Sequence, residues 1–467
     1  MMFLVLSLLS PAQAADVVDD DVAVTEADRT GVPRPFVGSY GRVQASTDLQ
    51  GGRGGGAQVT RWGPRLHKGP YLELDVGWDV DLEDGTEVTI LVTPGVSGDV
   101  FHYDGTFADD LALRNLYAEF RHIGGSPFSA WAGSRMYRGD DIYLLDMWPM
   151  DNLNTYGGGA MVDLGEQTRV AAHVGVNRLT RGDWQVQEAL VADPGSIDGE
   201  TVLVLDRQRT IGTLKAEHRI ALGKLTLRLK AYGEVHVLPS GERLVDEGIG
   251  AVIPQDLPAD QGFLAGAQVS LWGWGEQSFA HLWVRHATGL AAVGELTVPQ
   301  SGFDRSLRVK SSRSTVVATT GNSEHGRFGV QWAGTVLAYA DADGQRVDFD
   351  DRVEVVGVLR PNLWIGKHGA LSVELSQQVA RPNGLNPRTN SFDVAGITQI
   401  SVLPALQVAP GAYSRPRVQL VYSYTRLDAG ARAWFNPADV RYAEGTRHYV
   451  GLGAEWWIDS RRVVVPE

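Results

Sequence analysis

Apolar and polar side chains alternate with a period of two along much of the sequence. In residues 71–80, Tyr-Leu-Glu-Leu-Asp-Val-Gly-Trp-Asp-Val, one face carries leucine, valine and tryptophan, and the other carries tyrosine and carboxylates. Successive side chains point to opposite faces in an extended strand, so this period predicts strands that separate an apolar from a polar environment. Asp-Gly and Ser-Gly pairs between such segments predict turns. We therefore expect antiparallel hairpins along most of the chain.

Two fold classes fit this alternation, a soluble β-sandwich and a transmembrane β-barrel. The 13 tryptophans favour the barrel, because many lie near predicted strand ends, where a membrane barrel carries its aromatic girdles. Beyond the N-terminal segment, no stretch approaches the roughly 20 consecutive apolar residues of a transmembrane helix. Hairpins of tilted strands of about 10 residues allow about 16 to 18 strands in this length. The expected fold class is all-β, a transmembrane antiparallel β-barrel.

The N-terminus has the pattern of an export signal. Met1–Ser10 is apolar, and Pro-Ala-Gln-Ala follows as a small-x-small cleavage site. Cysteine is absent, so neither a disulfide nor a thiolate metal site can form. The net charge of −14 argues against nucleic acid as a partner. We predict a signal peptide over 1–14, an acidic leader over 15–35, a single barrel domain over 36–458 and a C-terminal tail over 459–467.

One segment combines the side chains that a sugar-selective channel needs. Residues 131–148 join the end of a predicted strand to a loop rich in carboxylates, arginines and aromatics. Sugars offer C–H faces on which aromatic rings stack, and hydroxyls that charged groups bind. A barrel of this circumference would otherwise be an open tube, so the loop is expected to fold inward as a constriction. The alternative is a solvated surface loop.

Three motifs in order along the chain resemble the maltoporin family. The similarity is carried by Trp131-Ala-Gly-Ser-Arg-Met-Tyr137 with Asp141 and Asp146, by Ser414-Arg-Pro at the start of a strand, and by Val450-Gly-Leu-Gly-Ala-Glu-Trp-Trp-Ile458. The resemblance covers residues 36–458 in patches. It implies a trimeric outer-membrane barrel of eighteen strands, in which a row of aromatic side chains guides sugars past charged groups.

The same resemblance assigns site residues one position at a time. The aromatic row is expected to contain Tyr40, Tyr71, Trp148, Trp364 and Trp457, and the polar lining Arg42, Glu73, Arg114, Arg138, Asp141 and Asp146. Alternation places Trp457 on the lumenal face with Glu455, and Trp456 on the opposite face. For Trp364 an interfacial girdle position is the alternative, and for each charged loop residue the alternative is pairing with the barrel wall.

Some positions depart from the family pattern. Gly139 occupies the position of a family arginine, and Arg138, one residue earlier, could substitute for it only if the loop backbone shifts. Ala265 stands where the family has an aromatic, so one stacking step is expected to be missing or supplied by Phe263. The acidic loop is expected to favour cations modestly.

These observations favour an outer-membrane porin for facilitated diffusion of carbohydrates, of the maltose and maltodextrin kind or other oligosaccharides. A general or ion-selective diffusion porin is the first alternative, and a periplasmic carbohydrate-binding β-sandwich is the second. No hydrolase or phosphate-binding motif occurs, so we expect no enzyme and no cofactor. His281 and His286 fall on opposite faces of one predicted strand, which predicts no metal site there. The expected partners are the sugar, outer-membrane lipid and further copies in a homotrimer.

Overall fold

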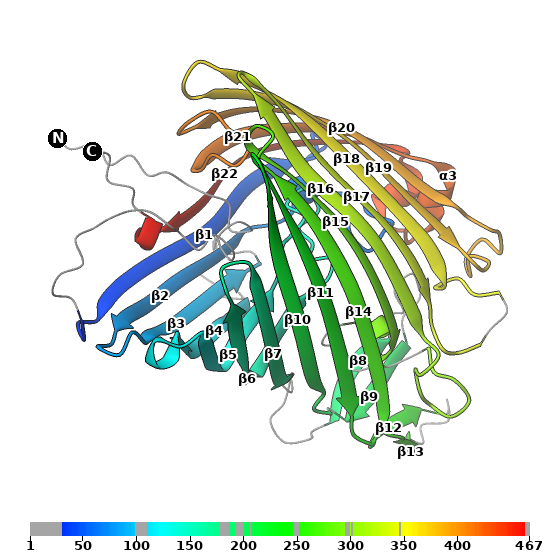
Figure 1. Cartoon of the computed structure of the whole chain (residues 1–467). Coiled ribbons are helices and arrows are strands. Elements are labelled where there is room, and N and C mark those ends of the chain that lie inside the picture. Colours follow the sequence, from blue (N-terminus) through cyan, green and yellow to red (C-terminus); the bar gives the residue numbers. More distant parts are fainter. Residues whose placement is uncertain are drawn as a thin grey trace, which may run out of the picture.

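A closed barrel of eighteen antiparallel strands dominates the fold (Figure 1). The computed structural model describes residues 30–98, 110–177, 186–191, 200–205, 207–246, 252–294, 299, 302–344 and 347–462. The barrel strands are β1 (Arg34–Thr47), β2 (Tyr71–Asp81), β3 (Glu87–Ser97), β4 (Asp110–Arg121), β5 (Phe128–Arg138), β6 (Asn152–Leu164), β7 (Thr168–Val176), β10 (Thr210–Leu222), β11 (Leu225–Leu238), β14 (Asp260–Trp272), β15 (Glu276–Gly289), β16 (Arg313–His325), β17 (Phe328–Ala340), β18 (Arg352–Ile365), β19 (Gly369–Pro382), β20 (Ala395–Gln407), β21 (Arg417–Leu427) and β22 (Thr446–Asp459). The predicted fold class is confirmed.

Pairing of the first and last strands closes the barrel. β1 lies antiparallel to β22, with Tyr40 opposite Trp457 and Thr47 opposite Val450. On its other side β1 pairs with β2, and β7 pairs with β10 across an insertion in the chain. Every barrel strand therefore has two hydrogen-bonded neighbours, which leaves no open sheet edge.

The connections differ in length at the two ends of the barrel. At one end β6–β7, β10–β11, β16–β17 and β18–β19 are joined by two or three residues each. At the other end the connections are long, as in residues 48–70 and 428–445. Short turns face the periplasm and long loops face the outside in barrels of the outer membrane. We call these the short-turn end and the long-loop end.

Several long connections contain structure of their own. A second sheet in the order β13-β12-β9-β8 lies beside the long-loop end (Figure 1). Its strands are β8 (Val186–Val191), β9 (Glu200–Leu205), β12 (Gly241–Asp246) and β13 (Val252–Leu257). The short helices are α2 (Leu290–Val293), α3 (Ala429–Ala433), α4 (Val440–Ala443), η1 (Arg65–His67), η2 (Ile123–Gly125) and η3 (Ser460–Arg462). Within the described ranges, no helix is long and apolar enough to cross a bilayer.

The strands turn their apolar face outward. In β18, Val353, Val355 and Leu359 are 43–45% exposed, whereas the intervening Glu354 and Arg360 are at most 3% exposed. Alternating strands of a soluble sandwich would bury the apolar set instead. The polar set is buried here because inward-folded chain segments fill much of the lumen.

The first and last strands set the limits of the barrel in the structure. β1 starts at Arg34, and β22 ends at Asp459, followed by η3. The predicted signal peptide over 1–14, most of the predicted leader and residues 463–467 of the predicted tail lie outside the described residues.

Candidate functional site

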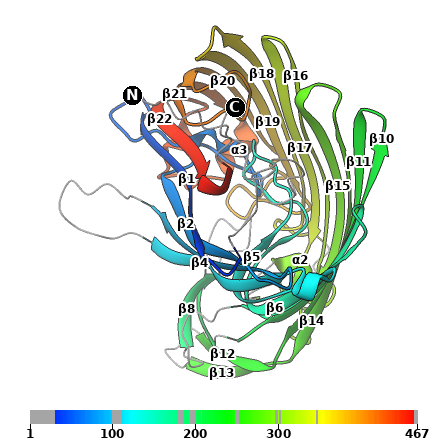
Figure 2. The same cartoon turned by 60° about the vertical axis from the view of Figure 1, so that its left-hand side comes forward.

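The connection between β5 and β6, residues 139–151, folds into the barrel interior (Figure 2). A tight turn shapes it, because the Ile142 N–H donates to the Met147 carbonyl over 2.7 Å and Asp146 adopts a left-handed backbone conformation with φ 51°. We call these residues the constriction loop.

Apolar packing fastens one side of the constriction loop to the barrel wall. Five loop side chains are at most 1% exposed, namely Ile142, Leu144, Leu145, Met147 and Met150. They pack in one cluster with lumenal side chains of β11, β14, β15, β16 and β18, among them Tyr232, Leu264, Trp283, Val316 and Val358. Removing this much apolar surface from water holds the loop inward without any ligand.

Two aspartates at the loop ends add buried ion pairs. Asp140 binds Arg228, and its Oδ2 lies 3.4 Å from Lys230 Nζ and 2.5 Å from Gln268 Nε2. Burial alone would raise the pKa of Asp140, but the cations Lys230 and Arg228 hold this pKa well below its usual range. At the other end, Asp151 lies 3.3 Å from Lys215 Nζ. These contacts are the loop-to-wall pairing that the sequence left as an alternative.

Tyr143 projects from the other side of the loop into a network of charged groups. Its hydroxyl donates to Glu455 Oε2 over 2.7 Å and accepts from Arg415. The guanidinium of Arg65 lies 4.0 Å from the Tyr143 ring centroid, and its Nη2 is 2.6 Å from Glu455 Oε1. A chain of neighbouring cations, carboxylates and one aromatic face therefore borders the loop.

The predicted residues Arg42, Asp141 and Asp146 lie beside this network. Asp146 is 3.3 Å from Arg42 Nη1 and 3.0 Å from Lys68 Nζ. Burial raises the pKa of Asp146, but the cations Arg65, Lys68 and Arg42 outweigh it and lower that pKa to about 2. For Asp141 burial prevails over the attraction of Arg65 and raises the pKa to about 7. The two loop aspartates thus differ in charge near neutral pH.

Three of the predicted aromatic residues form a continuous row inside the barrel. The rings of Tyr40 and Tyr71 are 5.8 Å apart, and Tyr40 is the register partner of Trp457 across the β1–β22 pair. Trp457 is 5% exposed and meets the Tyr143 ring edge to face at 6.2 Å. Trp456 points the other way, with its indole N–H donating to Ser39 Oγ over 3.1 Å. The structure places the two tryptophans as their alternation predicts.

The row continues toward the short-turn end of the barrel. Trp457 and Tyr40 belong to one cluster with Trp364, Phe279 and Tyr413. Trp364 is 3% exposed and lies on the same face of β18 as Arg360 and Asn362, so it is lumenal. The girdle alternative for this tryptophan is therefore excluded by its position.

The remaining predicted residues gather around Tyr71. Arg114 lies 3.5 Å from Glu73 and 5.9 Å from the Tyr71 ring centroid. A break in the β3–β4 register explains its position, because Thr93 pairs with Asn115 and Pro94 with Leu113, which leaves Arg114 as an extra residue.

Arg138 and Trp148 meet beside this group. The Arg138 guanidinium stacks 4.1 Å from the Trp148 ring centroid. Trp148 is thus covered by an arginine, while Trp364 lies in the separate cluster near the short turns. The predicted residues form two connected groups, joined through the Tyr40–Tyr71 contact.

One of the two sequence expectations for β14 is wrong. Phe263 and Ala265 share a face of β14, and Phe263 is 50% exposed, whereas Leu264 and Gln268 on the other face are buried. Phe263 and Ala265 therefore both point outward, so Phe263 does not supply the stacking step. The aromatic that β14 contributes to the lumenal cluster is Trp272.

Sequence reasoning missed several residues of the network. Arg65 comes from the irregular β1–β2 connection, for which no strand pattern gives a direction. Arg415 belongs to the Ser-Arg-Pro motif and Tyr143 to the loop motif, so both could have been selected there.

Two further arginines of the barrel wall belong to the same region. Arg360 pairs with Glu374 over 2.5 Å. Arg417, 2% exposed, has only Ser372 as a partner, and no carboxylate pairs with it among the described residues.

Comparison with known proteins supports the family resemblance. The sequence model of the LamB porin family matches residues 37–457. No curated protein matches the chain. Among solved structures, OccD3 of Pseudomonas aeruginosa has a TM-score of 0.46 at 10% identity, with 92% of each chain covered. OccAB1 of Acinetobacter baumannii has a TM-score of 0.47 at 10% identity, with 92% of this chain and 98% of that chain covered.

Proposed function

The chain belongs to the LamB porin family, and on that premise we propose that it is a channel for the facilitated diffusion of carbohydrates across the outer membrane. Family and fold support the coarser statement, an outer-membrane diffusion porin. The observation that carries the finer one is the continuous row of Tyr71, Tyr40 and Trp457 beside the constriction loop.

Charged groups on both sides of this row supply the other half of sugar recognition. Arg42 lies 5.4 Å from the Tyr71 ring centroid, and Tyr40 is within hydrogen-bonding distance of both Arg65 and Glu455. A sugar ring stacked on an aromatic face directs its hydroxyls sideways, where guanidinium donors and carboxylate acceptors can bind them. Paired charges of opposite sign attract a neutral polyol more than a bare ion of either sign.

Sugar block of single-channel current tests the proposal. Purified protein in a planar bilayer should show concentration-dependent closure by a linear glucose oligomer such as maltohexaose, added from either side. An equal concentration of polyethylene glycol of similar size serves as a control for exclusion without binding. If both polymers reduce the current equally, the carbohydrate proposal fails and the general porin remains.

A specific observation favours an anion-handling porin as the second candidate. Six cations surround the Tyr143 side of the passage, whereas only three carboxylates are paired with them among the described residues. The cations are Arg42, Arg65, Lys68, Arg360, Arg415 and Arg417, and the carboxylates are Asp146, Glu374 and Glu455. The loop aspartates Asp140, Asp146 and Asp151 already have cationic partners, so the expected cation preference loses its basis. Reversal potentials in a salt gradient test this second candidate, because an excess of fixed cations favours anions, while sugar block of the current tests the first.

The proposed assembly is a homotrimer in outer-membrane lipid, as the family resemblance implies. Light scattering of the detergent-solubilised protein, corrected for bound detergent, would give about three chains per particle. A particle of one chain would contradict the trimer without affecting the channel proposal.

A further inference from the structure

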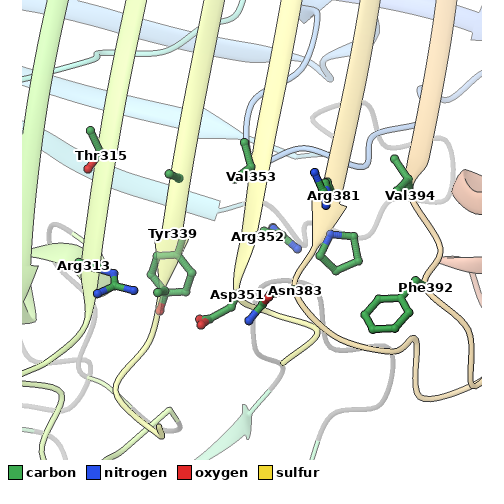
Figure 3. Close-up of a pocket in the computed structure, with 13 residues that line it drawn as sticks. Arg313, Thr315, Tyr339, Asp351, Arg352, Val353, Arg381, Asn383, Phe392 and Val394 are labelled. Carbon is green, nitrogen blue, oxygen red and sulfur yellow. The ribbon is translucent and has the colours of Figure 1, made fainter. Parts of the chain in front are cut away.

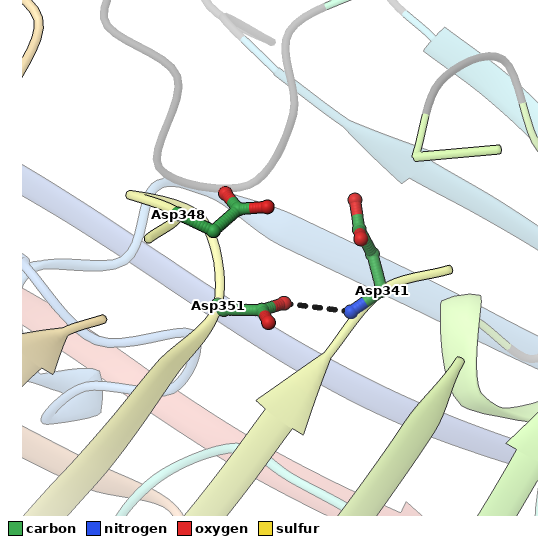
Figure 4. Close-up of side chains that lie close together, drawn as sticks. All are labelled: Asp341, Asp348 and Asp351. Atoms are coloured by element: carbon green, nitrogen blue, oxygen red, sulfur yellow. Dashed lines mark hydrogen bonds between the residues drawn. The ribbon is translucent and has the colours of Figure 1, made fainter. Parts of the chain in front are cut away.

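The connection between β17 and β18 is dense in carboxylates. Residues 341–351 contain five aspartates, at positions 341, 343, 348, 350 and 351, and lie at the long-loop end of the barrel. Asp341 follows the last residue of β17, and Asp351 precedes the first residue of β18. The two ends of this connection are therefore side by side, which brings Asp341, Asp348 and Asp351 together (Figure 4).

The three carboxylates are close enough to share one ion. One oxygen from each of Asp341, Asp348 and Asp351 lies within 4.8 Å of the others. Oxygens bound to a single Ca²⁺ at about 2.3–2.6 Å are at most about 5 Å apart, so an ion can reach all three where they stand. Mg²⁺ requires shorter bonds of about 2.0–2.1 Å and near-octahedral geometry, which suits this irregular loop less well.

Backbone amides occupy one oxygen of each carboxylate and leave the second free. Asp351 Oδ1 accepts from the Asp341 N–H over 2.7 Å, Asp341 Oδ1 from the Asp343 N–H over 2.9 Å, and Asp348 Oδ1 from the Asp350 N–H over 3.3 Å. These bonds fix the direction of each carboxylate. The same bonds cannot neutralise three adjacent negative charges.

Two of the free oxygens are buried without a partner. Asp341 Oδ2 and Asp348 Oδ2 are inaccessible to solvent and accept no hydrogen bond, and Asp348 as a whole is 7% exposed. An anionic oxygen that loses water and gains no partner is costly unless a cation or a proton neutralises it. The need to neutralise these two buried oxygens does not depend on how many acidic residues the loop contains.

Among the described residues, no cation pairs with Asp341 or Asp348. Burial and the charges of Asp348 and Asp343 raise the pKa of Asp351 despite the attraction of Arg313 on β16, and burial and the charges of Asp343, Asp348 and Asp351 raise the pKa of Asp341 to about 7. The β15–β16 connection lies close to the Asp341 carboxylate. A side chain at Gly302 would place its Cβ 2.5 Å from Asp341 Oδ2. The side facing Gly302 therefore has no room for a further side chain.

We propose that Asp341, Asp348 and Asp351 form a binding site for one Ca²⁺ ion in the β17–β18 connection. An ion entering it needs a path from solvent, and Asp351 provides one, because it also lines a groove of about 640 Å³ together with Arg313, Arg381 and Asn383 (Figure 3). Bound Ca²⁺ joins the two ends of the connection and so stiffens the external rim between β17 and β18. This site is separate from the constriction loop.

Calcium titration of the full-length protein in detergent, after treatment with EDTA, tests the site directly. Calorimetry at pH 8 should give about one ion per chain for the wild type, with Mg²⁺ binding more weakly. Asp348→Asn should weaken Ca²⁺ binding at least about tenfold, as loss of a ligand charge does. Glu166→Gln, an exposed carboxylate in the β6–β7 turn, is the matched control and should bind like the wild type.

Folding of each variant is checked by the shift in gel mobility between unheated and boiled samples. Absence of saturable Ca²⁺ binding in the wild type overturns the proposal. Equal Ca²⁺ binding by the wild type and Asp348→Asn overturns it as well, because co-purified lipid would then account for the bound Ca²⁺.

Discussion

Tyr143 in the constriction loop and Glu455 in the closing strand are joined by a hydrogen bond of 2.7 Å across 312 positions of sequence. The bond ties the charged side of the loop to the β22 wall, opposite the apolar side that packs on β11 to β18. The loop is therefore fixed on two sides, and the geometry of the passage depends on both attachments.

Tyr143→Phe should loosen the charged side of the loop. The ring and its contacts with Arg65 and Trp457 remain, while the bonds to Glu455 and Arg415 are lost. A hydrogen bond to a charged group contributes about 1.5–3 kcal/mol, so the open channel should become noisier while its mean conductance changes little. Noise spectra of single channels measure this. Tyr156→Phe, on an outward-facing tyrosine, should leave the spectrum unchanged.

Trp457→Ala should weaken sugar block, whereas Trp456→Ala should not. Trp457 is in the lumenal row and Trp456 is bonded to Ser39 on the other face. A stacking contact contributes about 0.5–1.5 kcal/mol, which corresponds to an increase of about two- to tenfold in the half-blocking concentration. Titration of the current with maltohexaose gives that concentration for each variant. Equal effects of the two substitutions would show that the row does not bind sugar.

Ion selectivity should change with pH near 7, because Asp141 titrates there. Below pH 7 the side chain is neutral and the passage carries its largest cationic excess, so anion preference should be strongest. As the pH rises through 7, Asp141 gains its charge and anion preference should decline. The same ionisation costs folding stability, because the folded pKa lies above the ordinary value and the neutral form fits the buried site better.

Two variants separate the roles of the loop aspartates. Asp141→Asn should retain the low-pH selectivity at every pH and abolish the change near 7. Asp146→Asn should shift the reversal potential toward anions throughout, with the change near 7 preserved, because the pKa of Asp146 is about 2. A change near 7 that survives in Asp141→Asn would assign the titration to another group.

Asp140→Asn should destabilise the folded barrel. The substitution leaves Arg228 and Lys230, 2% and 3% exposed, without their carboxylate partner in the loop. Breaking a buried ion pair costs about 3–5 kcal/mol, and Glu217 at 3.2 Å from Lys230 Nζ should keep the loss near the lower limit. The temperature at which the gel mobility of the folded form disappears reports the change. Asp163→Asn breaks the more exposed pair with Arg169 and should have little effect.

Strand patterns predicted the fold and the direction of lumenal side chains, because the membrane selects one face of every strand. Trp457 and Trp456 were separable on that ground alone. The same rule corrects the assignment of Phe263, since the residues that share its face in β14 are outward-facing. The family pattern and the alternation of this strand's own sequence disagree here, and the alternation is the better guide.

Connections were less predictable, because their conformation depends on contacts distant in sequence. Arg65 reaches the network only because its backbone N–H bonds the Leu144 carbonyl of the constriction loop over 3.1 Å. The loop was interpreted by its charges, yet Ile142, Leu145 and Met150 provide its packing against the wall. An apolar set within a charged loop indicates an inward anchor, and this signal was present in the sequence.

The pairing of β1 with β22 places Tyr40 and Trp457 on the first and last strands of the barrel, whose contact joins the two ends of the sheet. In a partly assembled sheet these rings stand on opposite free edges, and no row of aromatic faces exists between them. Under the proposed function, ligand affinity and completion of assembly are coupled at one seam: a chain that has not closed its barrel has no complete row on which a sugar could stack, and sugar binding would itself report that closure has occurred.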